Sequence, residues 1–346
     1  MRTVFWEDHQ LKMIDQRVLP ARFEIVSFRD HRSAAEAIRN MTVRGAPAIG
    51  AAAAFGLALA GFESASSSTS ELLADLRAAA ALLKSARPTA VNLAWAVERV
   101  MRVACSVGGS ADEMRVAILA EAQKIADEDV EINKRMAAHG ATLIDDGDTV
   151  IHHCNTGALA TVDWGTALGV IRTAHEQGKR VHVLVDETRP RLQGARLTAW
   201  ELEQYGIPYE IISDNMSGYF LRAGEAQKVF FGADRVASNG DVANKIGTYM
   251  LSLAAHDNGV PAYAVVPTST IDLSLAHGGL IPIEERDPAE VLALQFQNEP
   301  VAPKNARARN PAFDVTPNRL VSAIVTENGI VRPPYEVNLR AAVTRE

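Results

Sequence analysis

The sequence predicts an α/β protein of two domains, a mostly helical N-terminal domain followed by a C-terminal domain built on an open parallel sheet. The chain has 346 residues, more than one hydrophobic core usually contains. Helical periodicity dominates the first third, whereas short apolar runs and helical segments alternate after Asp145. We therefore expect a helical domain with a small β element over residues 1–120 and a catalytic domain over residues 121–346.

The N-terminal domain is expected to begin with short strands and continue with helices. The runs TVFWED, LKMIDQ and FEIVSFRD predict strands, and HRSAAEAIRNM, SELLADLRAAAALLKSA and VNLAWAVERVMRVAC predict helices. The run APAIGAAAAFGLALAGF lacks charged residues, but it is rich in Ala and Gly and shorter than a membrane span, which favours a buried helix. A charged helix over about 110–139, ending at Gly140, is expected to bridge the two domains.

The C-terminal domain alternates strands with helices. The predicted strands are TVIHHC, RVHVLVDE, YEIISD, KVFFGADRV and PAYAVVP, and one predicted helix covers about 158–177. Strands apolar on both faces are typical of a doubly wound parallel sheet, whose ligands bind beyond the carboxyl ends of the strands. The polar residues expected at that edge are Cys154, Asn155, Asp186, Glu187, Ser213, Asp214, Asp234 and Arg235.

Composition excludes several classes of protein. The net charge of −7 provides no basic field for non-specific nucleic-acid binding. The start, MRTVFWEDHQLKMIDQ, has no apolar signal-peptide core, so we expect a cytoplasmic protein that does not act at a membrane. The two cysteines, Cys105 and Cys154, form no CxxC motif, which argues against a redox dithiol and a cysteine-based zinc site.

Cys154 is the first candidate for chemistry. It ends a predicted strand and is expected to lie beside a helix start, where the helix dipole would favour the thiolate. Free cysteines are also among the most buried residues, so the pattern alone leaves both a reactive and a structural role open. His152 and His153 precede it, but no second cluster completes a zinc site, and we interpret both as partly buried hydrogen-bonding residues. The following turn lacks GxGxxG, which argues against a dinucleotide.

Asp234 is the second candidate. It follows the apolar run VFFGA, so we expect burial to raise its pKa and to make it a general acid. An ion pair with Arg235 or Lys245, or a helix cap, is the structural alternative.

Two segments are suited to anion binding. Arg44 precedes a Gly-Ala-Pro turn that is expected to open a helix, where backbone N–H groups favour phosphate. Asn244 and Lys245 are expected at a second helix start, and together with Arg87 and Gln193 these residues suit one phosphate group.

The stretches that carry these residues resemble the methylthioribose-1-phosphate isomerase family, aldose–ketose isomerases of methionine salvage that share their fold with the regulatory subunits of translation initiation factor 2B. The matching stretches are MTVRGAPAIGAAAAFG, HCNTGALATVDWGTALGVI, DETRPRLQGARLTAWEL, GADRVASNGDVANKIGTYMLSLAAH, GLIPIEER and NPAFDVTP with IVTENGI. They cover nearly the whole chain in the family's order. The resemblance implies a helical N-terminal domain, a Rossmann-like C-terminal domain and a homodimer.

Residue by residue, the resemblance implies that Cys154 and Asp234 are catalytic. The substrate-binding residues it implies are Arg44, Gly45, Ala46, Arg87, Gln193, Asn244 and Lys245. It implies a sugar-phosphate substrate and no metal or other cofactor. Relatives that act on 5-deoxyribose 1-phosphate or ribose 1,5-bisphosphate differ only in the 5-substituent they accept. A non-catalytic regulatory protein of the initiation-factor type is the distant alternative, since such relatives share the fold without the full Cys–Asp pair.

Overall fold

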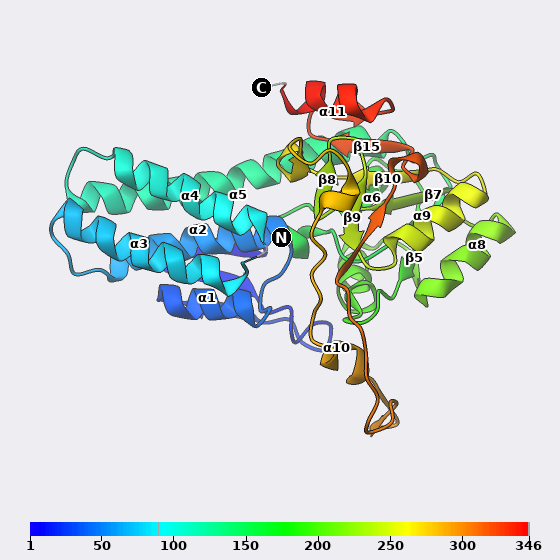
Figure 1. The fold of residues 1–346 in the computed structure, drawn as a ribbon, viewed down its shortest axis with the longest axis horizontal. Coiled ribbons are helices and arrows are strands. Elements are labelled where there is room, and N and C mark those ends of the chain that lie inside the picture. Colours follow the sequence, from blue (N-terminus) through cyan, green and yellow to red (C-terminus); the bar gives the residue numbers. More distant parts are fainter. Residues whose placement is uncertain (89, 345–346) are drawn as a thin grey trace. The chain divides into compact units, whose positions relative to one another are not determined.

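The computed structural model describes residues 1–88 and 90–344, which form two compact units (Figure 1). Unit 1 consists of Met1–Asn133 together with the short segment Gly157–Gly165. Unit 2 consists of Lys134–Thr156 and the chain from Thr166 onward. The chain passes from unit 1 to unit 2 within one long helix, α5 (Ala111–Ala141).

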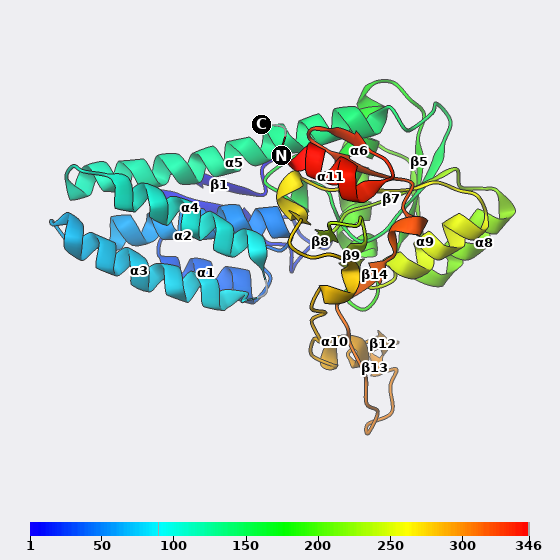
Figure 2. The same cartoon turned by 45° about the horizontal axis from the view of Figure 1, so that its top comes forward.

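Unit 1 contains a three-stranded antiparallel sheet and a group of helices packed side by side (Figure 2). Its strands are β1 (Val4–Glu7), β2 (Gln10–Ile14) and β3 (Ile25–Phe28), and its other helices are α1 (His31–Arg39), α2 (Ala46–Glu63), α3 (Thr69–Ala86) and α4 (Val91–Ser106). Asp30 and Ser68 cap α1 and α3 by accepting hydrogen bonds from Ser33 N and Glu71 N. The small β element and the helices agree with the sequence prediction.

Helix α2 is the centre of the core of unit 1. Every residue from Ala48 to Gly61 is buried, and the helix packs against α1, α3, α4, β1 and β2. Its small side chains allow this close approach on all faces. By length and composition α2 could cross a membrane, but 78% of it is buried inside the protein, as expected of a core helix.

Unit 2 is organised around a seven-stranded sheet in the order β16-β15-β10-β7-β4-β5-β6. The strands are β4 (Thr149–His152), β5 (His182–Asp186), β6 (Tyr209–Ile212), β7 (Lys228–Phe231), β10 (Ala262–Val265), β15 (Ala323–Thr326) and β16 (Gly329–Val331). All neighbours pair in parallel except β16, which is antiparallel to β15. Since parallel strands end at one edge of the sheet, the segments after β4, β5, β6 and β7 meet there, as the sequence predicts.

The connections of unit 2 are helices and a second, smaller sheet. The helices are α6 (Ala167–Glu176), α7 (Ala199–Tyr205), α8 (Ser217–Ala223), α9 (Thr248–Asp257), α10 (Ala289–Leu292) and α11 (Tyr335–Val343). The smaller sheet has the order β11-β8-β9-β14, with β8 (Arg235–Ala237), β9 (Val242–Lys245), β11 (Ile271–Asp272) and β14 (Phe313–Thr316).

Residues 285–311, which we call the arm, extend from the body of unit 2 (Figures 1 and 2). A bridge between Glu285 and Pro311 closes its base, and its distal part is the hairpin of β12 (Gln295–Phe296) and β13 (Glu299–Pro300). Arg191 anchors it through an ion pair of 2.8 Å with Glu290.

Two local predictions are wrong. The helix predicted over 158–177 begins only at Ala167, because residues 157–165 form a loop of unit 1 with one 3₁₀ turn at Ala158–Ala160. Asn244 and Lys245 end strand β9 instead of opening a helix, and α9 begins three residues later, at Thr248. Strand β9 pairs with β14, some seventy positions further along the chain, a partner that local periodicity does not reveal.

Candidate active site

Cys154 lies directly beyond β4 in an unusual backbone conformation. Its φ of +68° is in the left-handed region, which non-glycine residues adopt at a cost of roughly 1–3 kcal/mol. The Cys154 N–H donates a hydrogen bond of 2.9 Å to Thr188 Oγ1, and its carbonyl accepts one of 2.7 Å from Thr198 Oγ1. Cys154 is buried, and threonines hold both of its backbone polar groups, so its backbone conformation is held in place.

The helix start predicted beside Cys154 is absent, since the chain after it forms a loop until Ala167. Polar groups near the ends of the neighbouring strands β5 and β6 surround Cys154 instead. The Thr188 hydroxyl, which accepts from Cys154 N–H, also donates to Asp186 carbonyl oxygen at 2.9 Å. The backbone N–H groups of Thr188 and Arg189 both donate to Asp214, at 2.6 and 2.8 Å.

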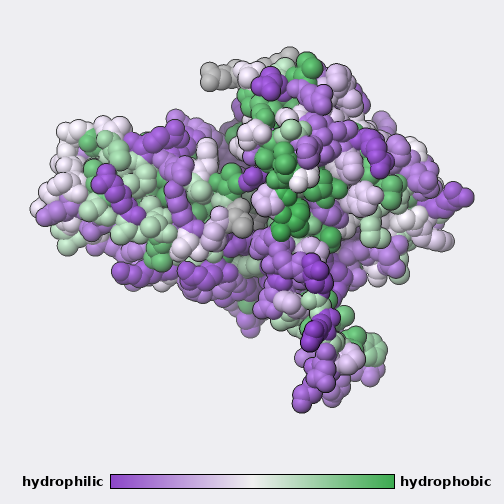
Figure 3. All heavy atoms as spheres, in the orientation of Figure 1, coloured by the Kyte–Doolittle hydropathy of each residue, from purple (hydrophilic) through white to green (hydrophobic). Residues whose placement is uncertain are grey.

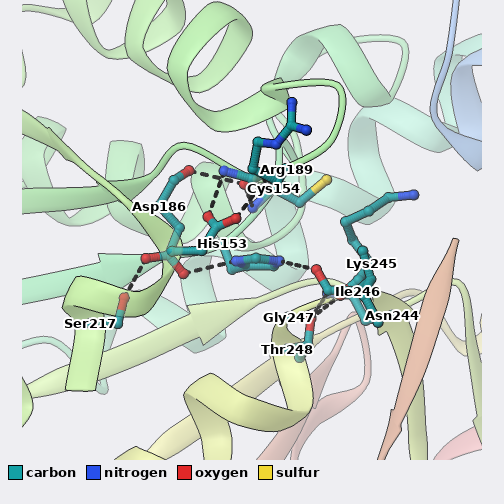
Figure 4. A network of polar contacts seen from close by, with 12 residues as sticks. His153, Cys154, Asp186, Arg189, Ser217, Asn244, Lys245, Ile246, Gly247 and Thr248 are labelled. Carbon is teal, nitrogen blue, oxygen red and sulfur yellow. Dashed lines mark hydrogen bonds and ion pairs between the residues drawn. The ribbon is translucent and has the colours of Figure 1, made fainter. Parts of the chain in front are cut away.

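His153 is the centre of a buried polar network (Figure 4). Its Nδ1 lies 2.8 Å from Asp186 Oδ2 and its Nε2 lies 2.9 Å from the carbonyl oxygen of Ile246. Ser217 donates a short hydrogen bond to the other oxygen of the same carboxylate. This network joins the end of β4, the end of β5, the start of α8 and the turn after β9.

The surroundings move the pKa values of the two histidines in opposite directions. Burial lowers the pKa of His153, but the hydrogen bond and charge of Asp186, with Asp214 and the Ile246 carbonyl, outweigh it, so the pKa is raised. Burial and the neighbouring charge of His153 lower the pKa of His152 to about 3. The interpretation of both histidines as hydrogen-bonding residues holds, although both side chains are fully buried.

His153, Asp186 and Asp214 also form the type of cluster that can hold a metal ion. One ligand atom from each lies within 4.8 Å of the others. These atoms already have hydrogen-bond partners within the protein, since both ring nitrogens of His153 face oxygen atoms and Asp214 accepts from two backbone N–H groups. The cluster is therefore better suited to a network of hydrogen bonds than to a metal.

Lys245 brings Cys154 and Asp234 into one electrostatic neighbourhood. It is 7% exposed, its Nζ donates a hydrogen bond of 2.9 Å to Ala312 carbonyl oxygen, and Nζ lies 4.7 Å from the centroid of the Phe313 ring. Burial lowers the pKa of Lys245, and the charges of Cys154 and Asp234 oppose that shift. Figure 4 shows the Cys154 thiol and the Lys245 side chain reaching toward the same region.

Asp234 follows β7 as predicted, but its predicted burial is wrong. The residues before it, Phe230 and Phe231, are fully buried, whereas Asp234 itself is exposed. The apolar run forms the strand interior, Gly232 is still buried and Ala233 half-buried, and the chain becomes exposed at Asp234, so the carboxylate does not enter an apolar pocket.

Two further predicted residues lie close by in unit 2. Gln193 is buried and immediately precedes a short π-helix, Gly194–Thr198, which also presents the Thr198 hydroxyl. Such helical irregularities are frequent at functional sites. Within the described residues, Gln193 Oε1 has no hydrogen-bond partner, so it remains able to accept one from a ligand. Asn244 donates a hydrogen bond of 2.9 Å to Thr248 Oγ1 at the start of α9.

The remaining predicted residues, Arg44, Gly45, Ala46 and Arg87, belong to unit 1. Gly45 is the N-cap of α2 with φ +96°, and a Cβ atom there would lie 2.2 Å from Ala160 carbonyl oxygen. Only glycine fits this turn, which leaves the first N–H groups of α2 available to an anion. Arg87 follows the end of α3. The structure therefore brings Cys154, Asp234 and Lys245 together, and it places the predicted arginines in the other unit.

Sequence reasoning did not single out the residues that hold the site in place. Thr188 and Thr198 fix the backbone of Cys154, and Ile246 receives a hydrogen bond from the His153 ring. Neither periodicity nor composition marks these positions. Asp186 and Asp214 were expected at the sheet edge because they follow predicted strands.

Comparison with known proteins identifies the family of the chain. The profile of the Initiation factor 2 subunit family matches residues 42–333. A methylthioribose-1-phosphate isomerase from Geobacter metallireducens is 52% identical over 99% of both chains. The solved 5-methylthioribose 1-phosphate isomerase from Pyrococcus horikoshii OT3 is 46% identical, with a TM-score of 0.93 over 99% of this chain and 95% of that one.

A structure described as the delta subunit of the translation initiation factor eIF-2B from A. fulgidus is 45% identical, with a TM-score of 0.90 over 99% of both chains. Full-length similarity therefore extends to proteins with both descriptions, whereas the curated relatives at about 50% identity carry the isomerase name. This chain belongs to the initiation factor 2 subunit family, and within it to the methylthioribose-1-phosphate isomerases.

Proposed function

We propose that this protein converts 5-methylthioribose 1-phosphate into 5-methylthioribulose 1-phosphate, a step of methionine salvage. The observation that carries the proposal is that the segments of Cys154 and Asp234 both contact the segment of Lys245. Asp234 N–H donates to the Ala243 carbonyl oxygen at 2.9 Å, and the ring of His153, next to Cys154, lies 2.9 Å from the Ile246 carbonyl oxygen. The names of the curated relatives support the reaction and its substrate.

We propose that the substrate-binding residues are those the sequence resemblance implies. The N-terminus of α2 after Gly45, with Arg44, supplies donors for a phosphate, and Arg87 supplies a second guanidinium group. Gln193, Asn244 and Lys245 add an amide oxygen, an amide and a cation from unit 2.

The substrate poses a specific chemical problem. Its anomeric oxygen carries the phosphate, so the sugar cannot open to a free aldehyde until the ring oxygen is protonated and the C1–O4 bond breaks. Asp234 is the proposed proton donor for this step. Because the carboxylate is exposed in the structure, this role rests on its position after β7 and on the resemblance, not on burial.

Two routes complete the isomerisation. In the first, a hydride moves from C2 to the electron-poor C1 while a base takes the proton of the 2-hydroxyl group. In the second, the Cys154 thiolate removes the C2 proton and an enediol forms, which is then protonated at C1. We favour hydride transfer, in which Cys154 stabilises the developing positive charge, because ring opening makes C1 cationic.

The reaction carried out in D₂O with EDTA present tests both the activity and the route. We expect full conversion to the ketose phosphate, followed by NMR, with no deuterium at C1. Substantial deuterium at C1 would replace the hydride route by the enediol. Activity that EDTA abolishes and a divalent ion restores would contradict the proposal that no metal cofactor is required.

We infer that the protein acts as a homodimer in the cytoplasm. The arm of unit 2 supports self-association, because Leu294, Phe296 and Val301 are 41%, 70% and 54% exposed on it. Figure 3 shows apolar atoms among the mainly polar ones of the arm. Sedimentation at micromolar concentration is expected to give twice the mass of the chain, and a monomer under those conditions would contradict the inference.

Three alternative functions can be distinguished from this one by experiment. Isomerisation of 5-deoxyribose 1-phosphate or of ribose 1,5-bisphosphate would use the same residues, with a different pocket for the 5-substituent. A regulatory role of the initiation-factor type is suggested by the A. fulgidus structure and predicts no turnover of any of these sugars.

A further inference from the structure

We propose that His153 is a positioning residue: an imidazolium, protonated on both ring nitrogens, that holds the strand end carrying Cys154 against the turn that follows Asn244 and Lys245. The effect that we predict on kcat rests on the proposed isomerase function. Its structural part concerns the protonation and partners of the ring and can be tested without any substrate.

The hydrogen-bond partners of the ring determine its protonation. The Nε2 atom lies 2.9 Å from the carbonyl oxygen of Ile246, which can only accept, so Nε2 must carry a proton. The Nδ1 atom lies 2.8 Å from Asp186 Oδ2, and the other oxygen of that carboxylate accepts from Ser217. Burial raises the pKa of Asp186, and its hydrogen bonds with His153 and Ser217 oppose that shift. Both carboxylate oxygens thus face donors, as suits an ionised carboxylate, so the shared proton belongs on Nδ1 and the ring is an imidazolium.

The charges around the ring require a cation. Asp186 is the last residue of β5 and Asp214 precedes α8, and their ligand atoms lie within 4.8 Å of that of His153. Asp314 on β14 also acts electrostatically on His153, and the His152 ring is the other titratable group beside it. Carboxylates this close repel each other in a buried site unless a positive charge compensates them.

The charged ring of His153 lies between the segments that carry Cys154 and Lys245. Ile246 lies between Lys245, the last residue of β9, and Gly247, which precedes α9. On the other side of the ring, the Asp186 carbonyl receives the hydroxyl of Thr188, which in turn accepts the N–H of Cys154. The segments that carry Cys154 and Lys245 are thus joined through one ring (Figure 4).

Close packing keeps the ring in this orientation. Gly247 has φ +105°, and a Cβ atom there would lie 2.8 Å from His153 Cε1. Any side chain at position 247 would therefore displace the ring, which is why the turn after β9 has glycine at this point.

The ring nitrogens of His153 can be observed directly by ¹⁵N NMR of histidine-labelled protein. We expect two protonated nitrogens with similar shifts that do not change between pH 6 and 9, assigned through the contact of the ring with Gly247. Widely separated shifts, typical of a neutral ring, would overturn the proposal, whether the missing proton lies on Asp186 or a bound metal has replaced it.

The Tm and kcat of a double variant distinguish a role of His153 in positioning the reacting groups from a role in protein stability. His153→Gln alone leaves a buried carboxylate unpaired and is expected to lose stability. Adding Asp186→Asn removes that charge, so the double variant should recover most of the Tm. Its kcat should nevertheless stay about 10- to 100-fold below that of the parent, with a smaller change in KM, because the reacting groups are misplaced.

The control is His182→Gln, which removes a histidine on β5 that faces Glu210 at 3.6 Å outside this network. It should keep kcat within about twofold of the parent. A double variant with parental kcat would overturn the positioning role. A parent without any isomerase turnover would contradict the proposed function instead, and the NMR result would still decide the protonation. If the double variant does not fold, the NMR result on the parent remains the test.

Discussion

Cys154 and Asp234 carry the proposed chemistry in very different surroundings. Cys154 is buried in a left-handed conformation that two threonine hydroxyls support, whereas Asp234 is exposed after β7. The exposed carboxylate can exchange its proton with solvent, whereas the buried cysteine has a backbone that is held in place.

Substitution of either side chain should abolish most of the activity without unfolding the protein. Asp234→Asn and Cys154→Ser are expected to lower kcat by roughly 10²- to 10⁴-fold, the usual contribution of one acid–base group. Since Asp234 is exposed, its variant should change the free energy of unfolding by no more than about 0.5 kcal/mol. Steady-state kinetics with a thermal melt checks both. A variant that keeps a tenth of the parental kcat would remove that residue from the chemistry.

Thr198→Val tests whether the backbone of Cys154 must be held. The substitution preserves the shape of the side chain but removes the 2.7 Å hydrogen bond to the Cys154 carbonyl oxygen. We expect a loss of about 1–3 kcal/mol in stability, as for other buried unsatisfied groups, and a fall of about tenfold in kcat with little change in KM. An unchanged kcat would show that the left-handed conformation is maintained without this contact.

The identities of the site residues could be read from the sequence, but their conformations could not. Cys154, Asp186, Asp214 and Asp234 follow strands that alternation predicts, and parallel strands end at one edge. The positive φ of Cys154 and the exposure of Asp234 depend on contacts with distant segments. No local pattern encodes these contacts.

At the scale of elements, the sequence predictions failed for segments whose structure depends on pairing with distant parts of the chain. Strand β9 pairs antiparallel with both β8 and β14. The pairing with β14 includes Asn244 and Lys245 and makes this segment a strand, although its composition suits a helix start. The loop Gly157–Gly165 likewise belongs to unit 1, where Thr3 N donates to Val162 carbonyl oxygen at 2.8 Å. Elements marked by continuous apolar runs, such as β5 and α2, were predicted correctly.

Helix α5 holds the same loop through a titratable group. Asp129 accepts a hydrogen bond of 2.8 Å from Val162 N–H, and burial raises the pKa of its carboxyl group to about 7. Between its ordinary pKa of 3.8 and about 7, the folded protein therefore binds a proton that the unfolded chain does not. The free energy of unfolding that this proton binding contributes is fully present below pH 3.8 and is lost as the pH rises toward 7.

Asp129→Asn should remove this dependence, because an amide oxygen still accepts from Val162 N–H and carries no charge. We expect the variant to be more stable than the parent at pH 8, on the order of 2–4 kcal/mol, and equal to it near pH 4. Denaturant unfolding at both pH values provides the comparison. A variant less stable than the parent at pH 8 would mean that the charge of Asp129 stabilises the folded protein.

At the scale of the whole molecule, the chain combines two compact units of different architecture. Unit 1 contains the buried helix α2, and unit 2 contains the sheet edge beyond which Cys154 lies. The fold class could be predicted because helical periodicity and strand–helix alternation occupy different parts of the sequence. The transfer of residues 157–165 to unit 1 could not, because only tertiary contacts define it.

The proposed substrate can be tested by measuring the specificity constant kcat/KM of the protein on three sugar phosphates. We expect kcat/KM for 5-methylthioribose 1-phosphate to exceed that for 5-deoxyribose 1-phosphate and for ribose 1,5-bisphosphate. Asp234→Asn, measured alongside, should lose turnover of all three. A higher kcat/KM for either alternative sugar, or no turnover of any of them by the parent protein, would contradict the account.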